Sequence, residues 1–109
     1  MSIEKFPSNN QEKQEVVMKN TAEFRGALDG GRLAEAEDFL TEVSSNPDKF
    51  PQYDERWLDH RQRELFQVFY KSEDWQGAKR VVEATKDAHS QDGRKARLEE
   101  LSGLDYDEI

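Results

Sequence analysis

Two histidines are the residues best suited to metal binding or proton transfer in this chain, because cysteine is absent. His60 and Glu64 lie four residues apart and would share one face of a helix, but two ligands do not make a metal site. His89 is separated from them by a predicted helix and a loop. The sequence therefore predicts no metal site and no cofactor.

The residues that could form other catalytic or ion-binding motifs are not arranged as those motifs require. Asp59 and His60 are neighbours on a predicted helix and point roughly 100° apart, so the carboxylate cannot orient the ring as a triad demands. Residues 105–108 are similar to the start of a calcium loop but lack its glycine and later glutamate. Gly30 and Gly31 precede a helix without the strand and lysine of a phosphate-binding loop. We therefore predict a protein that is not an enzyme.

The charge balance limits the class of partner. The 109 residues include 16 basic and 24 acidic side chains, for a net charge of -8. Binding to nucleic acid needs an excess of Lys and Arg, so we expect no nucleic-acid partner. The longest apolar runs, residues 16–18 and 68–70, are far shorter than the roughly 20 residues that span a bilayer, so we expect no membrane partner. Without cysteines to form disulfides, a cytoplasmic location is the default expectation.

The fold class follows from hydrophobic periodicity. Only 34% of the residues are hydrophobic and 37% are charged, but 10% are aromatic and can still build a modest core. Apolar residues recur at steps of three and four along the chain, which predicts amphipathic α-helices and an all-α fold. The expected organisation is one domain over residues 10–103 with unstructured ends, namely 1–9 (disordered arm), 10–46 (helical hairpin), 47–53 (proline loop), 54–89 (second hairpin), 91–102 (C-terminal helix begun by Asp92) and 104–109 (acidic tail).

The two predicted hairpins repeat each other with an offset of 42 residues. The offset pairs large and small residues in the same order, as Phe24 with Phe66, Leu28 with Tyr70, Leu33 with Trp75, Ala36 with Ala78, Phe39 with Val81 and Leu40 with Val82. A small alanine thus recurs where two helices must approach closely. A bulky residue at Ala36 or Ala78 is expected to force its hairpin apart.

The repeat resembles a known family. Residues 29–40 and 72–82 look like the turn and second helix of a tetratricopeptide repeat, and Leu65, Phe66 and Phe69 resemble the large positions of its first helix. The likeness covers residues 16–46 and 58–88 and implies two tandem antiparallel hairpins whose first helices line a concave groove.

The chain also departs from that family. Its period of 42 exceeds the roughly 34 residues of a tetratricopeptide repeat, and two hairpins are fewer than the three repeats usually needed for stability. A plain five-helix bundle therefore stays open as an alternative, and a homodimer could complete the stack.

A ridge of basic and amide side chains is the most informative polar feature. Its members follow one another at steps of three, four and four on one predicted helix, as His60, Arg63, Gln67 and Lys71. The resemblance implies that Met18 and Arg25 face the same groove, and that the ligand is a peptide or protein segment. Guanidinium, amide and ammonium donors would suit a carboxylate in it. The alternative is that Arg63 and Lys71 only solvate the helix or pair with nearby acids.

Two further features bear on function. Trp57 begins its helix beside the proline loop and is a candidate aromatic contact, because exposed tryptophans are frequent binding hot spots. We predict a non-catalytic adaptor or chaperone-like protein. The alternative is a small acidic inhibitor or antitoxin-like protein that blocks a basic surface through an acidic face formed by Glu35, Asp38 and Glu42.

Overall fold

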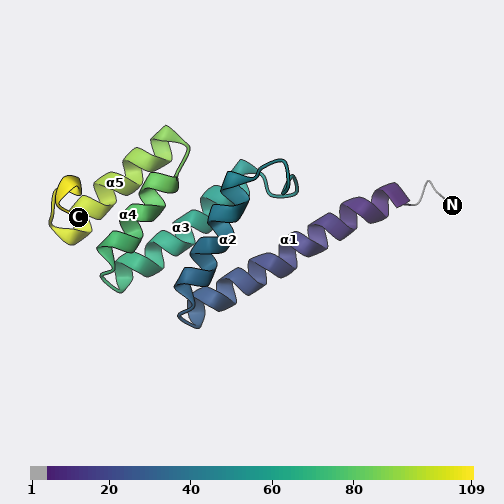
Figure 1. Cartoon of the computed structure of the whole chain (residues 1–109), viewed down its shortest axis with the longest axis horizontal. Helices are drawn as coiled ribbons and strands as arrows, with labels where there is room; N and C mark the ends of the chain where they lie inside the picture. The colour runs from purple at the N-terminus through teal and green to yellow at the C-terminus, as the bar shows by residue number, and fades with distance from the viewer. Residues whose placement is uncertain (1–4) are drawn as a thin grey trace. The chain divides into compact units, whose positions relative to one another are not determined.

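A computed structural model describes the backbone from residue 5 to residue 109 and the side chains from residue 13 onward. Within residues 5–109 the chain is helical and contains no strand, which confirms the all-α prediction (Figure 1). The helices in chain order are α1 (Lys5–Asp29), α2 (Leu33–Ser45), α3 (Glu55–Lys71), α4 (Trp75–Ala84), α5 (Ala88–Ser102) and the short 3-10 helix η2 (Tyr106–Glu108).

The chain divides into two compact units, residues 1–54 and residues 55–109, where the sequence predicted one domain. Each unit buries its own set of apolar side chains, which is why each is compact. The first unit buries Phe24, Ala27, Ala36, Leu40, Val43 and Tyr53. The second unit buries Leu65, Phe66, Phe69, Ala78, Val81, Val82 and Leu98.

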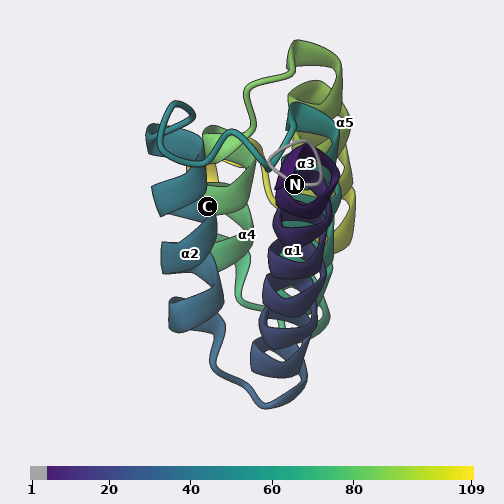
Figure 2. The same ribbon diagram turned by 90° about the vertical axis from the view of Figure 1, so that its right-hand side faces the viewer.

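The first unit is the hairpin of α1 and α2, which lie side by side (Figure 2). The loop after α2 turns back onto this hairpin, as its proline and aromatic residues predicted. Tyr53 is 8% exposed, meets the edge of the Phe39 ring at 5.9 Å and accepts a hydrogen bond from the amide of Asn20. The loop therefore contributes a large aromatic residue to the core of the first unit.

Helix α1 begins earlier than the sequence predicted. It starts at Lys5, inside the segment expected to be a disordered arm, and residues 1–4 lie outside the described part of the chain. Pro7 is compatible with this helix start, because backbone N–H groups in the first turn of a helix have no intrahelical acceptor.

The turns of the two hairpins are the same turn, 42 residues apart. Helices α1 and α3 end at Asp29 and Lys71, and α2 and α4 begin at Leu33 and Trp75. Three backbone hydrogen bonds of the first turn have counterparts in the second. In the first turn the N–H groups of Gly30, Gly31 and Arg32 donate to the carbonyl oxygens of Gly26, Leu28 and Ala27, respectively. In the second turn the N–H groups of Ser72, Glu73 and Asp74 donate to those of Val68, Tyr70 and Phe69. The predicted repeat is thus confirmed at its turn, whereas nothing in the structure tests a relationship to tetratricopeptide repeats.

Two positions of this turn are occupied differently in the two copies. The left-handed residue is Gly31, with φ +77°, in the first copy and Glu73, with φ +60°, in the second. The residue before the second helix is Arg32 in the first copy, without a side-chain cap, and Asp74 in the second, whose carboxylate accepts the Gly77 N–H. Each turn therefore has one favourable residue that the other lacks.

The second unit packs α3, α4 and α5 together. Ala78 is fully buried, as the predicted close approach requires, and Ala36 is 2% exposed in the first unit. The closest approach involves Gly77, where a Cβ atom would lie 2.5 Å from the Phe69 ring. A residue without a side chain is therefore required at position 77.

The boundary between α4 and α5 differs from the prediction. Helix α4 ends at Ala84, short of residue 89, and α5 begins at Ala88, before the predicted start at 91. Thr85 leaves the helix in an extended conformation with its side chain buried. Asp87, and not Asp92, caps α5 by accepting the Ser90 N–H at 2.9 Å. This hydrogen bond, then that of the Ser90 side chain, holds the pKa of Asp87 below its usual value.

Residues 104–109 are not a free acidic tail. Gly103 turns the chain back with φ +73°, and the Tyr106 N–H donates to Glu99 Oε2 at 2.9 Å. Lys79 Nζ donates to the carbonyl oxygens of Tyr106 and Ile109 at 3.2 and 3.1 Å. Burial, and then the nearby Glu83 carboxylate, raise the pKa of Tyr106. The acidic composition predicted that residues 104–109 would be solvated. Instead, the Lys79 ammonium group binds the backbone of this segment.

Candidate functional site

A groove runs along α3 and α5 in the second unit. The two helices point in the same direction, because α4, which lies between them in the sequence, runs in the opposite direction (Figure 1). The groove has a volume of about 460 Å³. Most of its lining residues have polar or charged side chains. They are Asp59, Arg63, Phe66, Gln67 and Tyr70 from α3, and His89, Ser90, Gly93, Arg94 and Arg97 from α5.

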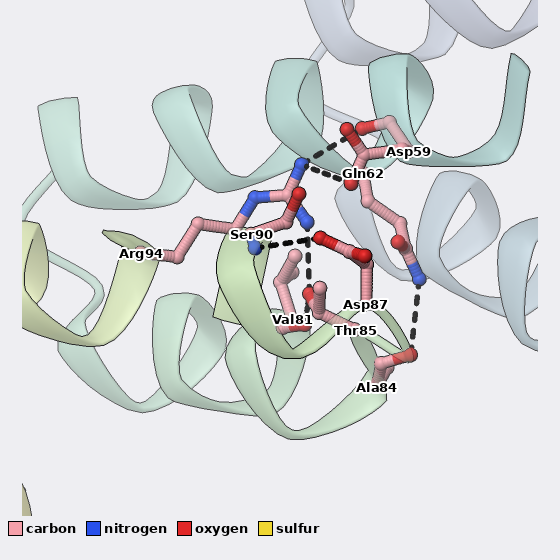
Figure 3. A network of polar contacts seen from close by, with 8 residues as sticks. All are labelled: Asp59, Gln62, Val81, Ala84, Thr85, Asp87, Ser90 and Arg94. Atoms are coloured by element: carbon pink, nitrogen blue, oxygen red, sulfur yellow. Dashed lines mark hydrogen bonds and ion pairs between the residues drawn. The ribbon is translucent and has the colours of Figure 1, made fainter. Parts of the chain in front are cut away.

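Arg94 joins the two helices that frame the groove (Figure 3). Its guanidinium donates to the Asp59 carbonyl oxygen and to Thr85 Oγ1, both at 2.9 Å, and lies 3.0 Å from Asp59 Oδ1. Thr85 Oγ1 in turn donates to Val81 O at 2.8 Å. Arg94 is 8% exposed, so its partners, and not water, satisfy most of its donors. This network fixes the spacing of α3 and α5.

Two glutamines fix the end of α4 beside this network. Gln62, only 5% exposed, donates to Ala84 O at 3.2 Å, and Gln91 donates to Val82 O at 3.1 Å. Both acceptors lie in the last turn of α4, where carbonyl groups lack the usual intrahelical partner and where Val82 O also accepts the Thr85 N–H at 3.1 Å. Side chains from α3 and α5 thus donate to the end of α4 and link the three helices.

The charges along the groove are predominantly positive. Arg94 is neutralised by Asp59, whereas Arg63 is exposed and has no ion-pair partner among the described residues. Arg97 lies 3.4 Å from Glu100, in a pair whose side chains are 50% and 70% exposed. Such a surface pair contributes little and exchanges readily. Arg63 and Arg97 therefore present guanidinium groups to the groove from opposite helices.

Gly93 leaves room on the α5 side of the groove. A glycine in a helix interior costs roughly 1 kcal/mol relative to alanine. At position 77 a Cβ atom would clash with the Phe69 ring, so packing requires glycine there, but a Cβ atom at position 93 would meet nothing within 4 Å. Packing therefore does not require Gly93, and the space beside it remains open to the groove.

Of the residues predicted to bind a partner, two lie in this groove, namely Arg63 and Gln67. His60 and Lys71 are exposed on α3 and do not line it. Trp57 is half-buried, with the Arg61 guanidinium 5.8 Å from its ring centre. The predicted four-residue ridge thus belongs to the groove only in its middle part.

The two predicted residues from the first helix lie in the other unit. Met18 is 71% exposed on α1, and Arg25 is exposed on the same helix. The groove between α3 and α5 is lined by residues of the second unit alone. A groove formed by the stacked first helices of the two hairpins stays a prediction.

The sequence pattern did not predict that α5 contributes to the groove, although it contains a signal for it. His89, Gly93 and Arg97 follow one another at steps of four and share one helical face. The predicted second hairpin ends at residue 89 and the predicted last helix begins at residue 91, so this stripe is divided between two predicted elements.

Metal-ligand clusters and membrane-spanning helices are absent from the described part of the chain. Among the residues from 13 onward, no three His, Asp or Glu side chains are grouped so that they could hold a metal ion. None of the described helices combines the length and apolar character needed to cross a membrane. No protein-family model, curated protein or solved structure matches the chain.

Proposed function

We propose that the protein is a non-catalytic protein-interaction module whose second unit binds an acidic segment of a partner protein in the groove between α3 and α5. The observation that supports this proposal is the pair of arginines, Arg63 and Arg97, on opposite sides of a groove in a chain of net charge -8. An adaptor or chaperone-like role is the cellular function that such a module would serve.

The ligand chemistry follows from the donors in the groove. A guanidinium group binds a carboxylate through two parallel hydrogen bonds, which gives both energy and orientation. Gln67 and Ser90 add polar groups that can pair with the backbone of a bound segment. The acidic remainder of the chain repels an acidic partner elsewhere, so the two arginines are the attractive region.

The groove is also held open before any ligand arrives. Arg94 bridges α3 and α5 directly, and the amide of Gln62 holds the end of α4. Binding then costs little ordering of the backbone, which favours affinity.

The experiment is a selection of random heptapeptides displayed on phage against the full chain, followed by fluorescence anisotropy with the selected peptide. We expect selected sequences rich in Asp and Glu. The double variant R63E/R97E should weaken binding by at least about tenfold, because two charge-assisted contacts become repulsive.

A matched control distinguishes the loss of contacts in the groove from the effect of a changed net charge. The variant R56E/K71E changes the net charge equally at two exposed positions of α3 outside the groove lining. It should leave binding within about twofold, since only screened long-range effects remain. Equal losses in both double variants, or a selection without acidic enrichment, would contradict the proposal.

Gly93 provides a test that leaves the charges unchanged. G93L fills the open space in the groove and should reduce binding, whereas G26L introduces the same side chain at an open position of α1 in the first unit. Unchanged binding in G93L would show that the ligand lies elsewhere.

A further inference from the structure

A second, smaller pocket lies in the first unit between α1 and α2. Its volume is about 160 Å³. Phe24, Ala27 and Ala36 form an apolar floor, each no more than 4% exposed, and Phe39 forms a half-buried wall. The pocket exists because alanines occupy both helices at this level, so no large side chain fills the space between the two phenylalanines.

The rim of this pocket is negatively charged. Glu23 on α1 and Glu35 on α2 line it, and both are exposed. Glu23 has no ion-pair partner among the described residues. Glu35 lies 3.4 Å from Arg32 in a pair whose side chains are 67% and 59% exposed, and such a pair yields readily to a competing cation.

We propose that this pocket receives one arginine side chain of a basic partner protein. The site is separate from the groove of the second unit and does not depend on the function proposed for it. The surrounding charge favours such a partner, because residues 1–54 contain 11 acidic and 6 basic side chains.

An arginine matches the pocket in each of its parts. Its aliphatic stem covers the apolar floor, as long basic side chains do on apolar surfaces. Its planar guanidinium stacks against the Phe39 wall and has enough donors to bind the carboxylates of both Glu23 and Glu35. A lysine ammonium is a more strongly hydrated point charge and cannot make the same forked contacts.

This pocket also gives the predicted acidic face a specific point of attachment. Of the three residues of that face, Glu35 lines the pocket, whereas Asp38 and Glu42 lie outside its lining. Recognition of a basic surface through the first unit should therefore depend on Glu35 more than on Asp38.

The test is a titration of the ¹⁵N-labelled full chain with blocked arginine, N-acetyl-arginine methylamide, followed by NMR chemical shifts. Blocked citrulline, which has the same shape without the charge, and blocked lysine are titrated in parallel. We expect saturable shifts at Asn20, Glu23 and Phe39 with arginine, and at least about fivefold weaker binding of citrulline and lysine.

Two double variants complete the test. E23Q/E35Q should remove the preference for arginine over citrulline, whereas E15Q/D38N, with the same charge change at exposed positions of α1 and α2, should retain it. Well-dispersed spectra show that each variant is folded. Equal binding of arginine and citrulline, or shifts spread over the unit without saturation, would overturn the proposal while leaving the groove of the second unit unaffected.

Discussion

In the first unit the hairpin α1–α2 is closed by a loop, whereas in the second unit the hairpin α3–α4 is closed by a helix. The loop contributes Tyr53, which packs against Phe39 and accepts one hydrogen bond from Asn20. The helix contributes Leu98, fully buried, and Arg94, which reaches α3 and the end of α4. The same hairpin is thus completed by two different kinds of contact.

This difference explains why the two units have different cavities. Where the loop folds onto α2, a small pocket with an apolar floor lies between α1 and α2. A helix that packs beside α3 is a second rigid wall and creates a long groove with side chains from both walls. The polar link through Arg94 keeps that groove at a fixed width.

The largest effect is expected from removing the polar link of the second unit. Arg94→Met replaces the aliphatic part of the side chain but leaves Thr85 and the Asp59 carboxylate without the guanidinium, so we expect a loss of about 3 kcal/mol in the free energy of unfolding. Urea denaturation measures the loss. Hydrogen exchange should show that protection falls in α3 and α5 before α1 and α2.

A smaller effect is expected from the corresponding change in the first unit. Tyr53→Phe keeps the ring that packs on Phe39 and removes the hydroxyl that accepts from Asn20, at a cost of about 1 kcal/mol. Tyr70→Phe is the matched control, since that hydroxyl has no hydrogen bond within the described residues. Equal unfolding free energies for the two variants would mean that the hydrogen bond from Asn20 to the Tyr53 hydroxyl does not stabilise the first unit.

Each turn should become more stable when it receives the favourable residue that the other copy has at the same position. Glu73→Gly relieves the left-handed backbone of the second turn, and Arg32→Asp introduces a cap in the first turn, where φ is -85° at both Arg32 and Asp74. Each change should stabilise the protein by roughly 0.5–1 kcal/mol. Thermal unfolding measures the gain, and the reverse changes Gly31→Glu and Asp74→Arg should lower the melting temperature.

The smallest effect concerns the cap of α5. Because the pKa of Asp87 is lower in the folded chain than its ordinary value, the ionised cap stabilises the protein above that ordinary value and the contribution disappears as pH falls through the folded pKa. Asp87→Asn should therefore flatten the acid side of the stability profile. The free energies of unfolding of the two proteins are compared by urea denaturation between neutral pH and pH 3. If the free energy of unfolding depends on pH in the same way in both proteins, the ionised Asp87 cap does not contribute to stability.

The features that the sequence predicted are those set by local residue patterns. The offset of 42 residues located both hairpin turns, because Gly30, Gly31 and the apolar periodicity act within a few residues. The end of α2 and the start of α3 were also predicted. Pro47 follows the end of α2, and Asp54 precedes the start of α3.

The features that the sequence did not predict depend on contacts between distant residues. Ser90 and Gly93 are typical of a helix break, but the Asp87 cap and the contacts of Arg94 with α3 carry the helix through them. The groove was accordingly found in part, through Arg63 and Gln67 on α3, whereas His89 and Arg97 on α5 were missed. The fold of residues 104–109 depends on Lys79, which is distant in sequence and was not identified as a partner.

The matching hydrogen bonds of the two turns have a consequence for how this chain can be rearranged. Because residues 29–33 and 71–75 have the same length and backbone pairing, crossing one copy over to the other at the turn would change neither helix register nor turn geometry. An insertion or deletion of 42 residues with its ends in the turn would therefore keep the turn in register. A gene for this chain could lengthen or shorten by one hairpin at this point without disrupting the joint.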